Sequence, residues 1–405
     1  MLFSISWRNV WRNKLRSAVI IIAIALGICA GVFSSAFYKG MADQRIDKAI
    51  KTEISHIQVH RPKFRQANDI SQFIPEADEL AARIGEIPEV SGVSSRIIIF
   101  SMASSAETAS GVKISGVMPG EESKVTNLHT KLIEGNYFEE ERRNPIIVGW
   151  KLAEKLNVKM GSKIVLTLQD IDNNIVAGAF RIIGIFNTAN GIYDESNVFV
   201  KHEDLRRLME LPDHSAHELA ILVEDNELIR ETQEKIQTLT GNLEVLSWTE
   251  LSPEMNYLNE AMDLFMYIFI IIILFALLFG IINTMLMVVL ERIKEIGMLM
   301  AIGMNRLRVF MMIVLESIFL SLTGGVIGVL MGGGISIYFE TNRIDLSMWG
   351  EVYQDLGYDP YVYTSLEFSL LVNVTILVII TGIIASLYPA YKALKNDPAD
   401  ALRIE

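Results

Sequence analysis

Cysteine is almost absent from this sequence. The only thiol, Cys29, lies within an uncharged run at residues 17–37, so no internal disulfide can form. The chain also lacks the phosphate loop G-x-x-x-x-G-K-[ST], the G-x-S-x-G elbow and the H-E-x-x-H zinc motif. We therefore expect no catalytic residue, no metal ligand and no nucleotide cofactor in this chain.

Charge is nearly missing from four long segments. A helix needs ~20 mostly apolar residues to cross the hydrocarbon core of a bilayer. The runs at 17–38, 264–290, 309–339 and 365–389 meet this condition, and we interpret them as four transmembrane helices. Because they carry so few ionisable groups, neither a proton relay nor an ion filter is indicated.

Basic residues gather on one side of these segments. Arg8, Arg12, Lys14 and Arg16 precede the first, and Lys392, Lys395 and Arg403 follow the last. The excess of positive charge on cytoplasmic loops places both termini in the cytoplasm, leaving 390–405 as a cytoplasmic tail. Residues 39–263 and the short loop 340–364, which includes the acids Glu351 and Asp355, then lie in the periplasm. Residues 40–263 hold 36 acidic against 23 basic residues, a net charge of −13, which disfavours a nucleic-acid partner.

The segment 39–263 predicts a mixed α+β domain of two lobes, the second at about 115–200, because helical and alternating patterns follow one another. Strands are expected at 53–60, 90–102, 111–117, 145–149, 163–169, 175–186, 197–200, 219–223 and 243–247, and helices at 75–87, 150–156, 203–211, 228–238 and 249–262. Along 53–60, His56, Gln58 and His60 alternate with apolar residues and predict a solvated strand face. The two imidazoles would lie ~13 Å apart, too far for one metal ion.

Two amphipathic elements flank the first and second membrane segments on the cytoplasmic side. Residues 1–16 place Phe3, Trp7 and Trp11 near one face, which suits an interfacial helix. Residues 291–308 form a charged hairpin between two apolar runs, where Gly303 can end a helix in the left-handed conformation. A cytoplasmic partner that pushes on this hairpin would move both membrane segments, and the residues that we expect to couple such a partner are Glu291, Arg292, Lys294, Glu295, Gly303 and Arg306. The alternative is a loop that only reverses the chain.

The third apolar run has a spacing typical of close helix packing. Gly324, Gly328 and Gly332 recur every four residues and predict a ridge against another helix. Glu316 is an acid inside this run, which is a functional candidate by default. We interpret it as structural, placed to reach the interface or to pair with Arg308.

The chain resembles the ABC transporter permeases of the macrolide-exporter and FtsX-like superfamily. The resemblance rests on the segment ERIKEIGMLMAIGMNRLRV at 291–309, on the C-terminal YPAYKA and DPADAL stretches at 388–393 and 397–402, and on 132–200. It implies an α-helical membrane protein with a large extracytoplasmic α+β domain, of the mechanotransmission type. A separate cytoplasmic ATPase would bind ATP and Mg²⁺ and push the hairpin, and a second permease chain would complete a homodimer or heterodimer in the bacterial inner membrane.

Within that superfamily, the chain resembles the lipoprotein-releasing permeases in its length, in its large outer domain and in the absence of a fused ATPase. The resemblance implies release of lipoproteins from the outer leaflet of the inner membrane, with membrane lipid contacting an apolar surface at residues 20–33. Two alternatives remain open. One is an efflux or peptide-export permease with a periplasmic adaptor, and the other is a signalling permease that controls a cell-wall hydrolase.

Overall fold

The computed structural model describes residues 2–139, 143–350, 353 and 358–395. The expected acids Glu351 and Asp355 and the C-terminal segment 396–405, with its DPADAL stretch and Arg403, lie outside the described residues. The chain forms two compact units. The membrane unit comprises Met1–Asp43, Asn259–Asp345 and Tyr361–Glu405, and the α+β unit comprises Gln44–Leu258 and Leu346–Pro360. Each is described by itself.

Four helices of the described chain are long and apolar enough to cross a membrane. They are α2 (Lys14–Ala49), α11 (Pro253–Glu291), α13 (Arg306–Thr341) and α15 (Phe368–Lys395). The four-helix fold class is therefore confirmed. The helices run beyond the expected apolar segments because charged but helix-compatible residues extend them. A π-helix, Ile50–Ile54, continues α2. Helices α2 and α11 each begin in one unit and end in the other.

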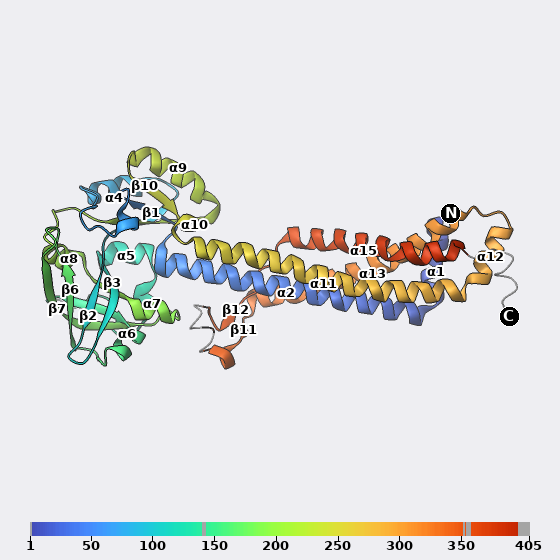
Figure 1. The fold of residues 1–405 in the computed structure, drawn as a ribbon, viewed down its shortest axis with the longest axis horizontal. Coiled ribbons are helices and arrows are strands. Elements are labelled where there is room, and N and C mark those ends of the chain that lie inside the picture. Colours follow the sequence, from blue (N-terminus) through green and yellow to red (C-terminus); the bar gives the residue numbers. More distant parts are fainter. Residues whose placement is uncertain (1, 140–142, 351–352, 354–357, 396–405) are drawn as a thin grey trace. The chain divides into compact units, whose positions relative to one another are not determined.

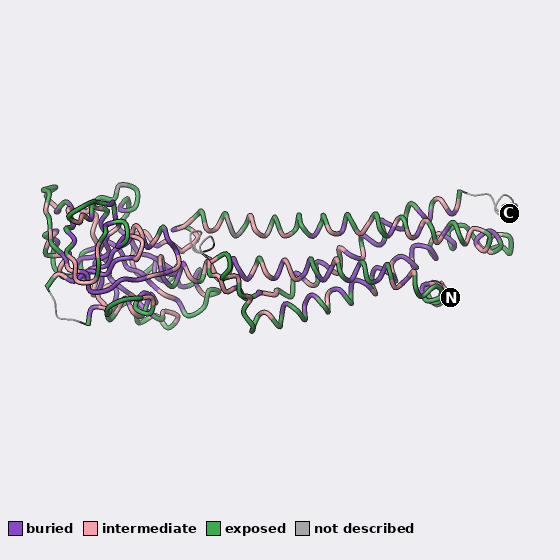
Figure 2. Tube along the Cα trace, turned by 90° about the horizontal axis from the view of Figure 1, so that it is seen from below, coloured by how far each residue is buried: buried purple, intermediate pink, exposed green. Residues whose placement is uncertain are grey.

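Smaller elements complete the membrane unit (Figure 1). Helix α1 (Leu2–Arg12) precedes α2, α12 (Ile293–Ala301) connects α11 to α13, and β11 (Ile344–Asp345) pairs with β12 (Tyr361–Val362). The four long helices share one apolar core, while their outer faces carry exposed residues along their length (Figure 2). Such exposed apolar faces suit a bilayer as solvent.

The glycines of α13 lie against α2. A Cβ at Gly324 would come within 2.8 Å of the Cβ of Ile24, and one at Gly328 within 2.7 Å of the Ala25 carbonyl oxygen. At Gly332 it would come within 2.9 Å of the Cys29 carbonyl oxygen. Only a residue without a side chain allows backbones to approach this closely.

The α+β unit is built on one mixed sheet of the order β10-β1-β9-β2-β3-β8-β5-β7-β4, with β6 pairing with β2 and β7. The strands are β1 (Ile57–His60), β2 (Val90–Ser104), β3 (Ala109–Val117), β4 (Leu132–Gly135), β5 (Pro145–Gly149), β6 (Lys163–Gln169), β7 (Ile175–Phe186), β8 (Asn197–Lys201), β9 (Glu218–Val223) and β10 (Glu244–Ser247). The β3–β8 and β5–β7 pairs are parallel.

The helices of this unit cover the sheet and define its apolar cores. They are α3 (Phe64–Ala67), α4 (Ala77–Gly85), α5 (Pro119–Val125), α6 (Trp150–Lys155), α7 (Gly191–Ser196), α8 (His202–Leu208), α9 (Ile229–Thr240) and α10 (Trp248–Leu251). One core includes Ile57, Ile84 and Ile236, and another includes Ile114, Leu166 and Phe180. The expected mixed α+β domain is confirmed, although helices α3, α5 and α7 and strand β4 were not expected.

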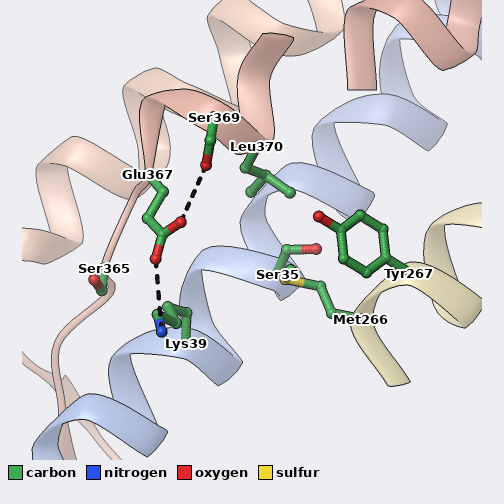
Figure 3. A pocket seen from close by; sticks show the side chains of 8 residues that line it. All are labelled: Ser35, Lys39, Met266, Tyr267, Ser365, Glu367, Ser369 and Leu370. Carbon is green, nitrogen blue, oxygen red and sulfur yellow. Dashed lines mark hydrogen bonds and ion pairs between the residues drawn. The ribbon is translucent and has the colours of Figure 1, made fainter. Parts of the chain in front are cut away.

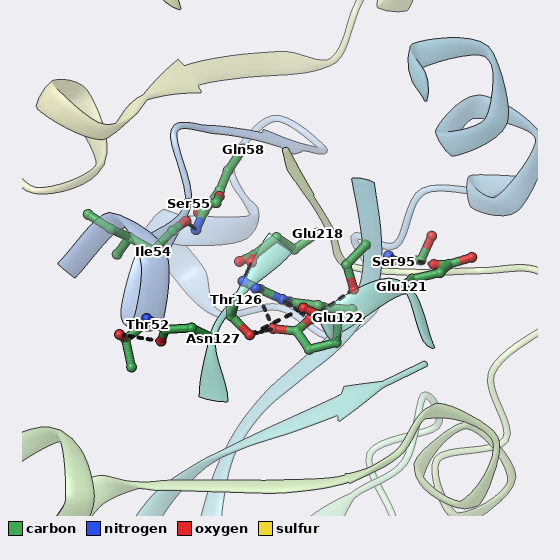
Figure 4. Close-up of polar contacts among 12 residues, drawn as sticks. Thr52, Ile54, Ser55, Gln58, Ser95, Glu121, Glu122, Thr126, Asn127 and Glu218 are labelled. Carbon is green, nitrogen blue, oxygen red and sulfur yellow. Dashed lines mark hydrogen bonds and ion pairs between the residues drawn. The ribbon is translucent and has the colours of Figure 1, made fainter. Parts of the chain in front are cut away.

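A buried ionic cluster connects three elements of this unit (Figure 4). The guanidinium of Arg96 on β2 donates to Glu122 of α5 at 2.7 Å and to Glu218 of β9 at 2.7 Å. All three side chains are almost fully buried. Thr126 also donates to Glu122, at 2.9 Å. Because removing one partner would leave an unpaired buried charge, the cluster fixes α5 and β9 to β2.

The expected solvated face of residues 53–60 is wrong. His56, Gln58 and His60 are all buried, because β1 lies between β10 and β9 and both of its faces are covered. Gln58 donates to the Ile54 carbonyl at 2.6 Å, and its side-chain oxygen lies 3.0 Å from His60 Nε2. Alternation identified the strand, but its polar side chains are buried and bond to one another and to the backbone, except that His60 Nδ1 has no partner among the described residues.

Candidate functional site

The hairpin between α11 and α13 is shaped by local hydrogen bonds. Helix α12 ends at Ala301, and Gly303 adopts a left-handed φ of +101°. The Gly303 N–H donates to the Met300 carbonyl at 3.1 Å, and the Met304 N–H to the Leu299 carbonyl at 3.0 Å. These bonds satisfy carbonyls at the helix end, and the turn needs a residue that tolerates positive φ.

The next helix begins directly after this turn. The side-chain oxygen of Asn305 accepts a hydrogen bond from the Leu307 N–H at 3.1 Å, so Asn305 caps α13. Arg306 is therefore the first residue of α13. With both ends fixed, the hairpin is an ordered unit and not an irregular loop.

A buried carboxylate connects the hairpin to the membrane core. Glu316 of α13 is 4% exposed and accepts from Asn9 Nδ2 at 2.6 Å. It also accepts from Arg292 Nη1 at 3.1 Å. The expected pairing with Arg308 is therefore wrong. Arg292, directly before α12, forms the ion pair with Glu316, whereas Arg308 on the first turn of α13 is exposed.

Two further ion pairs connect the hairpin to the N-terminal basic segment. Arg16 and Glu291 form a bidentate pair at 2.6 and 2.7 Å. Arg12 contacts both oxygens of Glu295 at 2.9 Å, and Arg292 lies 3.0 Å from the same carboxylate. Burial disfavours the charged form of Glu295, but the hydrogen bonds from Arg12 and Arg292 outweigh it and lower its pKa. Because these outer pairs are partly exposed, they position the hairpin more than they stabilise it.

Helix α1 packs on α13 and carries Asn9 and Arg12, whereas Arg16 lies on α2. The Ser6 hydroxyl donates to the Met312 carbonyl at 3.2 Å, and the rings of Phe3 and Trp7 contact Phe319 edge to face. Ser6 and Val10 are its buried face, whereas Trp7 remains 44% exposed. This arrangement agrees with an amphipathic helix whose aromatic edge faces the surroundings.

The tip of the hairpin is exposed and apolar. Ile302 is 86% exposed, Leu307 65% and Met298 49%. The cations Lys294 and Arg306 are exposed beside them. An apolar patch rimmed by charge is typical of a protein-interaction surface. We call Met298, Ile302 and Leu307 the tip patch.

The structure separates the predicted coupling residues into two groups. Glu291, Arg292 and Glu295 form ion pairs with Arg16 of α2, Glu316 of α13 and Arg12 of α1, whereas Lys294 and Arg306 are exposed beside the tip patch. Sequence reasoning missed Asn9 and the tip patch. It also missed the ion pairs Arg12–Glu295 and Arg16–Glu291. The two arginines are four residues apart and so are the two glutamates, and this matched spacing could have revealed the pairing.

Comparison with known proteins gives two family matches. Residues 17–239 match the MacB-like periplasmic core domain, and residues 267–398 match the FtsX-like permease C-terminal region. The lipoprotein-releasing system transmembrane protein LolC of Xylella fastidiosa strain 9a5c is 23% identical over 304 residues, 72% of each chain. The macrolide export ATP-binding/permease protein MacB of Bdellovibrio bacteriovorus is 25% identical over 360 residues, 80% of this chain and 52% of that protein.

Among solved structures, the periplasmic region of MacB from Actinobacillus actinomycetemcomitans is similar with 9% identity and a TM-score of 0.36, covering 54% of this chain and 97% of that one. The match to the MacB-like core domain covers most of α2 and most of the α+β unit. The match to the FtsX-like region covers most of α11, the hairpin, α13 and α15. This chain therefore belongs to the ABC transporter permeases that combine a MacB-like periplasmic core domain with an FtsX-like permease region.

Proposed function

We propose that this chain is the permease subunit that carries motion from a separate cytoplasmic ATPase to a periplasmic α+β unit, in order to release lipoproteins from the outer leaflet of the inner membrane. The single observation that supports it most is the α12 hairpin, with an exposed tip patch and a base held by Arg292 and Glu316. A push on such a tip moves the helices on both sides of it. The phosphate-binding motif that the sequence lacks would belong to the ATPase, together with ATP and Mg²⁺.

The connectivity supports transmission along the chain. Helices α2 and α11 each cross the boundary between the two units without a break, so no flexible loop separates them at these two connections. An unbroken helix transmits axial displacement, whereas a disordered linker absorbs it. A second permease chain, identical or related, would bind beside the first, with both termini of each chain in the cytoplasm.

The lipoprotein cargo is supported by the relatives named LolC and by the surface of α2. Ile22 and Leu26 are 56% and 57% exposed along this helix, which offers an apolar face to acyl chains. Depletion of the protein followed by membrane fractionation tests the cargo. We expect lipoproteins to accumulate in the inner membrane, and their normal arrival at the outer membrane would contradict this part of the proposal.

Export with a periplasmic adaptor is the second candidate, and the similarity to MacB over 80% of this chain favours it. The two functions predict different partners for the α+β unit. Covalent capture of an adaptor by that unit, together with normal lipoprotein sorting in depleted cells, would favour export. A signalling role in control of a cell-wall hydrolase would instead predict a hydrolase among the captured proteins.

Binding of the ATPase tests the hairpin. Ile302→Asp places a charge in the tip patch without touching the ion pairs at its base, and we expect at least a tenfold loss of ATPase co-purification, about 1.4 kcal/mol. Met348→Asp is the matched control, because Met348 is 82% exposed but lies outside the hairpin. Equal recovery of the ATPase with both variants would exclude the tip patch as its binding surface.

A further inference from the structure

A small polar cavity lies among helices of the membrane unit (Figure 3). It has a volume of about 90 Å³ and is lined by α2, α11, α15 and the residues just before α15. Its polar lining includes Ser35 and Lys39 of α2, Tyr267 of α11, and Glu367 and Ser369. These residues belong neither to the hairpin nor to the tip patch, so coupling to an ATPase does not explain them.

The charges of this cavity favour a ligand with a positive group. Lys39 Nζ lies 3.3 Å from Asp43 Oδ1 and 3.5 Å from Glu367 Oε1. Ser369 Oγ donates to Glu367 Oε2 at 3.1 Å. Asp43 pairs with Lys39 from outside the cavity lining, so two carboxylates surround one ammonium and this group carries a net negative charge. A carboxylate offers about four lone-pair sites, and Glu367 can accept further donors.

A buried hydroxyl in the same wall adds an independent observation. Ser35 is 1% exposed, and its Oγ has no hydrogen-bond partner among the residues that the structure describes. A buried polar group without a partner destabilises the fold, because it has lost its hydrogen bond to water. A ligand that hydrogen-bonds this hydroxyl would replace that bond.

An apolar groove continues from the polar cavity. It has a volume of about 460 Å³, lies between α2 and α11, and shares Ser35 and Met266 with the smaller cavity. Phe265, Phe269 and Ile272 line it and are 68%, 43% and 60% exposed. A polar cavity joined to an apolar groove on a membrane-spanning unit suits an amphiphile, with its head in the former and an acyl chain in the latter.

We propose that this site binds a membrane phospholipid with a phosphoethanolamine head. The primary ammonium, with three donors, hydrogen-bonds Glu367, and the phosphate accepts from Lys39 and the Ser35 hydroxyl. A choline head has no N–H to donate. A purely anionic head would meet two carboxylates and only one lysine. The site therefore discriminates among lipid heads by charge and by hydrogen-bond donors.

This inference goes beyond the proposed function, because it requires only that the helices lie in a membrane. Its failure would leave the coupling of the ATPase untouched, and a failure of lipoprotein release would leave the lipid site untouched.

Native mass spectrometry of the purified full chain tests the site. After removal of co-purified lipid, the protein is titrated with phosphatidylethanolamine, phosphatidylcholine and phosphatidylglycerol. A charged hydrogen bond is worth about 1.5–3 kcal/mol, so we expect phosphatidylethanolamine to bind at least about tenfold more tightly than the other two. Glu367→Gln should abolish this preference, whereas the matched control Glu340→Gln, at an exposed acid outside the cavity, should retain it.

A second variant separates ligand binding from folding. Ser35→Ala removes a hydroxyl without a partner in the described structure, so the delipidated protein should keep its thermal stability while losing affinity for phosphatidylethanolamine by several-fold. Equal binding of the three lipids by the native chain would overturn the proposal. So would an unchanged preference for phosphatidylethanolamine in Glu367→Gln or unchanged affinity in Ser35→Ala.

Discussion

Glu316 is the residue at which three helices of the membrane unit meet. A carboxylate is costly in an apolar core unless a counter-charge and hydrogen bonds accompany it. Here Arg292 supplies the charge and Asn9 supplies a further donor, so α12, α13 and α1 meet at one side chain. The base of the hairpin is therefore anchored to the membrane core, as the proposed coupling requires.

Glu316→Gln tests this anchor. The variant leaves the Arg292 guanidinium, itself only 16% exposed, without its buried counter-charge, and we expect a loss of about 3–5 kcal/mol of stability. Thermal unfolding of the purified protein measures the loss. Adding Arg292→Gln should restore part of it, because the half-buried guanidinium, then paired only with the more exposed Glu295, is removed. An unchanged melting temperature in the single variant would show that the pair contributes nothing.

Histidines inside the α+β unit set its response to acid. Burial lowers the pKa of His60 to about 4, against the opposing effect of the Glu218 charge. Burial also lowers the pKa of His56 and of His217. The folded state therefore favours neutral imidazoles, whereas the unfolded chain takes up protons below a pH of about 6.5.

The expected consequence is loss of stability as the pH falls. Above pH 6.5 His60 is neutral in both states and does not change the free energy of unfolding. Between pH 6.5 and about 4 only the unfolded chain protonates this imidazole, so the free energy of unfolding falls by roughly 3 kcal/mol in total, at 1.36 kcal/mol for each pKa unit. Denaturant unfolding of the α+β unit at pH 7, 6 and 5 measures the decline. His60→Gln should flatten the slope. A stability independent of pH over this range would contradict the burial of a neutral imidazole.

At the scale of elements, the contact between α13 and α2 depends on three glycines. Their spacing of four residues places them on one face of α13, and the structure places α2 against that face. Any Cβ there would meet backbone or β-branched side chains, so the distance between the two helices is fixed by the absence of side chains.

Gly328→Leu is expected to force these helices apart. Overpacking of a close contact costs typically 1–3 kcal/mol, and a leucine against the Ala25 carbonyl belongs at the upper end. Gly334→Leu is the matched control, because a Cβ at Gly334 would meet no atom within 4 Å. A lower melting temperature for the first variant alone would support the packing, and equal melting temperatures would argue against it.

Elements that depend on local pattern could be predicted from the sequence, and long-range partners could not. The apolar runs predict the four long helices, and Gly303 predicts the turn after α12. Each of these predictions depends only on residues that are neighbours in the chain. The burial of His60 depends on β9 and β10, which lie more than 150 residues away in the chain. The pairing of Glu316 with Arg292 and Asn9 required the same knowledge of distant contacts.

For the whole molecule, we propose that force from a separate ATPase enters at one hairpin and acts in the α+β unit. The α+β unit is a continuous sheet held by buried contacts such as the Arg96 cluster. Such a unit suits rigid displacement. The claim therefore depends on where the ATPase binds.

Photo-crosslinking in intact membranes tests this most directly. A photoreactive amino acid replaces Lys294 on α12 in one chain and Ala106, in the exposed β2–β3 turn, in another. The account predicts that only the chain labelled at position 294 crosslinks to the ATPase, and that the yield changes when ATP is added. A crosslink to the ATPase from position 106, or none from position 294, would contradict it.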